Sequence, residues 1–162
     1  MAGISKHNGS NIAGVRSITL LELDGVSTTA DGLKIPIPID GEISANLTVA
    51  AGSQHPIFIM ESQATLRSQQ TETAAGRQFQ STLVCFTPAT RQAATETLKL
   101  LHAQHLLVLM TDENGQQRLM GNDEQRVTMQ ANEVQIEGRN GYEITLTFNS
   151  SSPVPWYSGV LS

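Results

Sequence analysis

The histidines are the side chains of this chain whose spacing comes nearest to a chemical site. His102 and His105 lie three positions apart, so on a helix they would share a face and could offer two ligands to one metal ion. A zinc site needs further ligands, and the sequence places none beside this pair. We therefore expect no metal and no cofactor.

The acidic, serine and cysteine residues form no catalytic set either. Asp112-Glu113 and Asp123-Glu124 lie at predicted turns, and no calcium loop of the Asp-x-Asp-x-Asp-Gly type occurs. No serine has a Gly-x-Ser-x-Gly context, and the phosphate-binding glycine spacings are missing from the sequence. The one cysteine, Cys85, sits in a strand-like pattern that favours a small buried side chain. We expect a protein that is not an enzyme.

Composition narrows the class of partner. Charged residues make up 15% of the chain, against about 25% in typical globular proteins, so Gln, Thr, Ser and Asn must cover much of the surface. The net charge of −5 and ten scattered Lys and Arg residues argue against nucleic acid as a main partner. No apolar run approaches the roughly 20 residues of a membrane span. Low charge also weakens repulsion between copies, which favours self-assembly.

The elements that would position these residues begin with a helix and a hairpin. Thr87-Pro88 suit the first positions of a helix, and the helix is expected to continue over 89–104 with Leu98 and Leu101 on its apolar face. A buried strand over 106–110 follows, then an Asn-Gly turn and a return strand over 116–120.

A second hairpin is expected over 125–148. Its first strand, 125–137, is predicted to be interrupted near Ala131-Asn132, and Gly138 to Gly141 is the predicted turn. From Tyr142 to Phe148, apolar and polar residues alternate, which indicates a strand with one buried face and one face toward water or a partner.

A long polar hairpin over 62–86 is the unusual part of the chain. Its expected turn is 71–76, and its apolar face is weak. Such a hairpin is marginal alone in water, so either it twists over the domain or neighbouring copies flank it. The side chains that share its polar face, and that would lie between subunits or line a lumen, are Thr65, Arg67, Gln69, Gln78, Gln80 and Thr82.

The remaining segments are expected to be extended. Residues 1–13 are predicted to form a flexible tail, 25–55 an extended arm or loop that contains two alternating prolines, and 150–162 an extended tail that leaves the domain. Trp156 and Tyr157 in that last tail could dock on a partner, or could pack back on their own core.

The expected fold is therefore mainly β with one α-helix. It is a single domain over 1–162, built as an antiparallel β-sandwich or barrel with a flanking helix and a long polar hairpin.

The order of these elements resembles small tail-tube proteins of phages and of gut-bacterial prophages. The segments that carry the resemblance are Gly14 to Leu20, Leu106 to Met110 with Leu119 to Asn122, and Asn140 to Phe148 followed by a Ser/Pro tail. The resemblance covers most of the chain and brings no catalytic residues.

The resemblance implies a structural protein of the virion, assembled in the bacterial cytoplasm into hexameric rings that stack into a tube. Its partners would be further copies of itself and other tail proteins, with DNA only as transiting cargo and no membrane contact. Three alternatives stay open: a tail-completion or joining ring, a tube component of a contractile injection system, and a stand-alone ligand-binding β-barrel.

Overall fold

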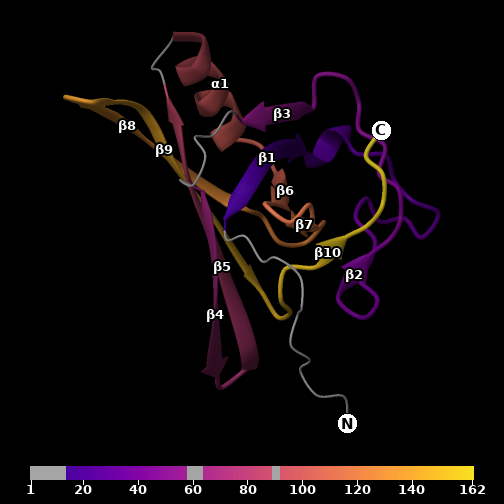
Figure 1. Ribbon diagram of the computed structural model, residues 1–162. Coiled ribbons are helices and arrows are strands. Elements are labelled where there is room, and N and C mark those ends of the chain that lie inside the picture. The colour runs from indigo at the N-terminus through magenta and orange to yellow at the C-terminus, as the bar shows by residue number, and fades with distance from the viewer. Residues whose placement is uncertain (1–13, 58–63, 89–91) are drawn as a thin grey trace.

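Two sheets face each other in the computed structural model, which describes residues 14–57, 64–88 and 92–162 (Figure 1). The first sheet contains β1 (Val15–Glu22), β2 (Glu42–Ile43), β3 (Gln54–Ile57), β6 (Leu106–Asp112), β7 (Gln117–Met120) and β10 (Trp156–Tyr157). The second contains β4 (Thr65–Thr73), β5 (Gly76–Pro88), β8 (Thr128–Ile136) and β9 (Arg139–Ser150). The strand orders are β2-β10-β7-β6-β1-β3 and β4-β5-β9-β8. The mainly β prediction is confirmed as a sandwich, and the sheets do not close into a barrel.

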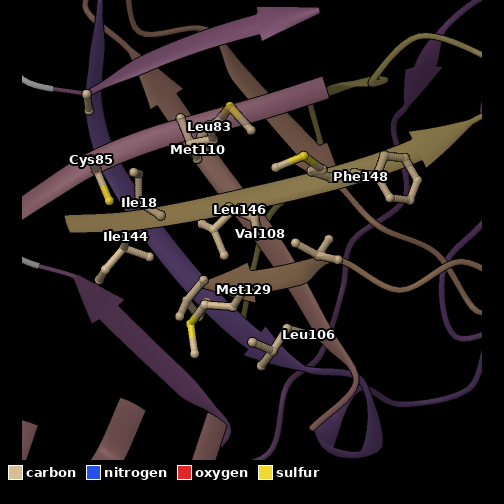
Figure 2. Packing of buried hydrophobic residues seen from close by; sticks show 14 of the residues in the cluster. Ile18, Leu83, Cys85, Leu106, Val108, Met110, Met129, Ile144, Leu146 and Phe148 are labelled. Atoms are coloured by element: carbon tan, nitrogen blue, oxygen red, sulfur yellow. The ribbon is translucent and has the colours of Figure 1, made fainter. Parts of the chain in front are cut away.

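The main core lies between the two sheets. On β9 the predicted alternation holds, since Tyr142, Ile144, Leu146 and Phe148 are all buried and the residues between them are more exposed. They meet the apolar face of the six-stranded sheet, and Figure 2 shows Ile144 and Leu146 pointing toward Ile18 and Val108.

A second apolar cluster covers the other face of the six-stranded sheet. Leu21, Leu107 and Leu119 point to this side. Most of the segment expected to be an extended arm or loop over 25–55 packs on them as an irregular layer, and its end from Gln54 enters the sheet as β3. Ile35 is buried in the layer at 3% exposure, because Asp123 accepts the backbone N–H groups of Lys34 at 3.1 Å and Ile35 at 2.9 Å.

The C-terminal segment 150–162 does not leave the domain, which corrects the predicted tail. Trp156 and Tyr157 form β10, which pairs with β7 on one side and β2 on the other. The chain end is also held, since the N–H of Ser162 donates to the carbonyl of Leu47 at 2.9 Å. Extended backbone after the prolines suits a short strand, and the buried side chains of Val154 and Tyr157 stabilise it there.

The helix is shorter than expected. Helix α1 spans Gln92–His102, whereas Thr87 and Pro88, its predicted start, are the last residues of β5; residues 89–91 lie outside the described residues. Leu101 is buried in the main core and Leu98 packs against it, as the spacing predicts. The predicted apolar face of the helix is therefore confirmed, whereas its predicted start is wrong. Pairing with β9 extends β5 through Pro88, so the helix begins later.

Two hairpin turns are tighter than the sequence suggests. β8 runs without interruption through Ala131-Asn132, and the turn to β9 is Glu137-Gly138, with Gly138 at a φ of 81°. The predicted turn residue Gly141 lies inside β9, where a Cβ atom would come within 2.1 Å of the Thr87 carbonyl oxygen.

Ladder pairing also continues to the end of the long hairpin, so its turn is residues 74–75 and not 71–76. The predicted flexible tail 1–13 lies outside the described residues.

Candidate assembly surface on the four-stranded sheet

The structure brings the six predicted polar side chains of the long hairpin onto one face. Arg67 pairs with Thr82, and Gln69 pairs with Gln80. Directly opposed residues of a ladder share a face. Thr65 precedes Arg67 by two positions and Gln78 precedes Gln80 by two, so both lie on this face too. All six are exposed except Thr82, which is half-buried.

The same face continues across the rest of the sheet. Thr82 pairs with Thr147 of β9, which pairs with Thr128 of β8. Val84 likewise pairs with Thr145, which pairs with Gln130. We call this surface the polar face; its members on the described strands include Thr65, Arg67, Gln69, Gln78, Gln80, Thr82, Thr128, Gln130, Asn132, Thr145, Thr147 and Asn149. Sequence reasoning placed the hairpin residues but missed that β9 and β8 extend their surface.

Hydroxyl and amide groups dominate the chemistry of the polar face. Among the described side chains of this face, Arg67 of β4 and Glu143 of β9 are charged, and Val84 of β5 with Val134 and Ile136 of β8 are apolar. Amides and hydroxyls donate and accept hydrogen bonds, whereas tight binding of a phosphate backbone needs many clustered cations. The face therefore offers many hydrogen-bonding groups and few clustered cations.

Both edges of this sheet are long and open. β4 and β8 are each nine residues long, and no described strand pairs with the outer edge of either. Helix α1 occupies only the start of the β8 edge, where Nδ1 of His102 donates to the carbonyl oxygen of Met129 at 3.0 Å. Unpaired edges of this kind offer backbone groups to another chain.

The end of the long hairpin projects beyond the sandwich (Figure 1). From Ser68 to Gln78 every residue is exposed, whichever face of the ribbon it points to. Ser68 and Ser81 hydrogen-bond to each other at 3.1 Å across the side that faces inward. Both faces of the projecting ribbon are thus exposed to solvent. An isolated two-stranded ribbon of this kind is only marginally stable in water.

The predicted docking pair is split by the structure. Tyr157 is only 4% exposed and belongs to the second apolar cluster, so it packs on its own core. Trp156 is 41% exposed, and the guanidinium carbon of Arg118 lies 3.8 Å from its ring centroid. Trp156 alone keeps a surface that a partner could reach.

The three histidines within the described residues bond to carbonyl or carboxylate groups. His102 binds the Met129 carbonyl, His105 binds the Asn122 carbonyl at 3.0 Å, and His55 pairs with Glu22 at 2.7 Å. Within the described ranges, no three His, Cys, Asp or Glu side chains gather closely enough to hold a metal ion.

The thiol of Cys85 is fully buried, and burial raises its pKa to about 12. A thiol that keeps its proton at neutral pH is a poor nucleophile. Over the part of the chain that the structure describes, no helix is long and apolar enough to cross a membrane.

Comparison with known proteins adds no relative: the chain matches no family model, no curated protein and no solved structure.

Proposed function

We propose that this chain is a non-enzymatic structural protein whose copies join edge to edge through their four-stranded sheets and close into a ring. The polar face of each copy then lines the lumen. The observation that carries the proposal is that β4 and β8, each nine residues long, have no partner strand on their outer edges among the described residues, and that α1 covers only the start of β8.

The directions of the two edge strands suit a ring. Successive neighbours in the sheet are antiparallel, so β4 and β8 run in opposite directions. When β8 of one copy meets β4 of the next, the alternation continues unbroken around the ring. Repeated head-to-tail contacts of this kind close whenever the rotation between copies allows it.

The stagger of the edges also suits a closed barrel. Followed across the sheet, Thr65 of β4 is level with Gln130 of β8, and Arg67 is level with Thr128. Only three of the nine residues of β4 have a residue of β8 at the same height across the sheet, so the two strands are displaced along their axes by six residues.

This displacement corresponds to a definite strand tilt. Six residues span about 20 Å along a strand, and four strand spacings span about 19 Å across the sheet. A six-residue displacement sets residues 130–136 of β8, beyond the start that α1 occupies, opposite 65–71 of β4. It requires a tilt of about 45°, at the upper end of the range found in closed barrels. This tilt is the same for any number of copies.

The tail-tube resemblance supplies the biological setting of the proposal. Rings would stack into a tube of a phage or prophage tail, with other tail proteins at its ends and DNA as transiting cargo. A lumen of hydroxyls and amides, with few charges, lets a polyanion pass without tight phosphate contacts. The protein would then act in the virion after assembly in the bacterial cytoplasm.

Native mass against concentration tests the proposal. Light scattering and negative-stain images of the largest species are expected to reveal rings or tubes with a central hole. A compact monomer at every concentration would contradict the proposal and favour a stand-alone binding module.

A further inference from the structure

A hollow lies beside the open edge of β4. It has a volume of about 510 Å³. Its walls come from the start of β4, from the start of β1 and from the β6–β7 hairpin, and they include Thr65, Leu66, Ser68, Gln116, Arg118 and Trp156. The hollow therefore opens where, in the proposed ring, a strand of the next copy would arrive.

Arg118 is the cation of this hollow, and among the described residues it forms no ion pair. Its guanidinium stacks on Trp156, with 3.8 Å to the ring centroid. No carboxylate of the described residues forms an ion pair with it. The nearest acidic influence is Asp112, whose Oδ1 already accepts the N–H groups of Asn114 and Gln116 at 2.9 Å each.

Partial burial makes this arrangement costly for an unpaired charge. Arg118 is half-buried, and desolvation lowers the pKa of its guanidinium by more than the nearby charge of Asp112 raises it. A guanidinium stacked on an indole still presents its N–H edge, and that edge fits a carboxylate. The hollow is thus built to receive an acidic side chain.

The geometry of the proposed ring identifies the acidic side chain of the neighbouring copy that would enter the hollow. A six-residue displacement sets Ile136 of one copy opposite Thr65 of the next, and therefore Glu133 opposite Ser68. Glu133 pairs with Tyr142 within its own sheet, and Ser68 pairs with Ser81. Tyr142 and Ser81 are both buried toward the core, so Glu133 and Ser68 point to the same, inward side of the continuous sheet.

Glu133 is free to make this contact. It is exposed, and its one hydrogen bond among the described residues comes from the amide of Gln135 at 2.7 Å on the same strand. Ser68 lines the hollow together with Arg118. A carboxylate placed over Ser68 therefore enters the space that the guanidinium faces.

We propose that the hollow beside β4 is the receptor for β8 of a neighbouring copy, and that Arg118, stacked on Trp156, binds the carboxylate of Glu133 from that copy. This inference rests on the proposed ring and assigns its specific ion pair. Each copy offers one Glu133 at one edge and one Arg118 near the other, so the contact is directional and repeats around the ring.

Charge exchange tests the pair. Glu133→Arg and Arg118→Glu are each expected to raise the concentration needed for assembly by tenfold or more, because like charges then meet. The chain that carries both changes, and an equimolar mixture of the two single variants, are expected to recover assembly, since every interface regains opposite charges. Asp31→Arg, which makes the same charge change as Glu133→Arg in an exposed loop, is the matched control and should assemble like the original chain.

The outcomes separate this inference from the ring itself. If the original chain forms rings and the two single variants assemble as well as the control, the ion pair is wrong and the ring stands. If the single variants fail and neither the double variant nor the mixture recovers, the pair is also overturned. Thermal unfolding of each dilute variant checks that Arg118→Glu still folds. If the original chain forms no rings, the proposed function fails first and the ion pair with it.

Discussion

The two sheets of this protein differ in how completely the chain covers them. The six-stranded sheet has apolar clusters on both faces. Its edge strands are short, with two residues in β2 and four in β3, and β3 contains Pro56. The four-stranded sheet has one covered face, one polar face and two nine-residue edges. Short strands and prolines are common protections of a sheet edge, so the protein protects one sheet and leaves the other available.

This difference indicates that the two sheets contribute differently to the stability of the subunit. The six-stranded sheet and its two clusters stabilise the subunit, whereas the polar face of the four-stranded sheet lies outside both clusters and, with the outer edges of β4 and β8, forms the contact surface of the proposed ring. Substitutions in the two regions should therefore separate cleanly into effects on folding and effects on association.

Leu107→Ala should give the largest loss of stability. Leu107 is fully buried on the face covered by the irregular layer, and truncation of such a leucine costs about 3 kcal/mol. Chemical denaturation of the dilute protein measures this change. A loss under about 1 kcal/mol would mean that the layer over 25–49 is a loose arm after all, and the contrast between the sheets would shrink.

Proline substitutions in β8 should have the next largest effect. They should differ according to whether the lost N–H points to the outer edge or toward β9. The Met129 carbonyl points away from β9, toward His102, and the alternation of an antiparallel ladder directs the N–H of Ala131 outward as well. Ala131→Pro should abolish assembly and leave the monomer nearly as stable. Asn132→Pro removes an inward N–H and should cost about 2 kcal/mol or more of monomer stability.

The two proline variants differ by one position, so each controls for the other. Native mass and thermal unfolding are measured on both. If Ala131→Pro still forms normal rings, β8 does not form the interface between copies.

Alkaline pH should destabilise the subunit through Cys85 in the main core. Burial raises the pKa of the folded thiol to about 12 from its ordinary value of 9.0. Above pH 9 the unfolded chain loses a proton that the folded chain keeps, so stability falls as pH rises from 9 toward 12, by up to about 1.4 kcal/mol per pH unit.

The variant Cys85→Ala isolates this effect. Its stability should decline less steeply above pH 9, and the remaining slope includes Tyr157 of the second cluster, whose pKa burial also raises. Denaturation midpoints at several pH values measure both slopes. Parallel curves for the two proteins would show that the thiol is not protected by the core.

Thr145→Ala on the polar face should have the smallest effect. Thr145 is half-buried at the centre of the outer surface, and surface changes away from special features stay within about 0.5 kcal/mol. Unfolding and native mass should both match the original chain. A loss above 1 kcal/mol would mean that the outer face, too, stabilises the subunit.

The sequence predicted the strands that bury one face and missed the segments fixed by distant contacts. The alternation from Tyr142 to Phe148 follows from local pattern and is confirmed. The C-terminal strand β10 was read as a tail because prolines precede it. Its pairing with β7 and β2 depends on residues far away in the chain.

The candidate site was predictable only in part for the same reason. Six polar residues of the long hairpin could be assigned to one face from their period of two. That β9 and β8 continue this face depends on strand order, which no local signal carries. The hollow at Arg118 combines residues of β1, β4, β6, β7 and β10, which are far apart in the chain, and no local pattern indicates it.

Hydrogen exchange of the assembled and dilute protein tests the central claim most directly, because it reports each strand edge separately. We predict that amides of β4 and of the free part of β8, residues 130–136, become protected on assembly, while those of β2 and β3 stay unchanged. Protection at β3 in place of β4 and β8, or no change at either edge of the four-stranded sheet, would contradict the account.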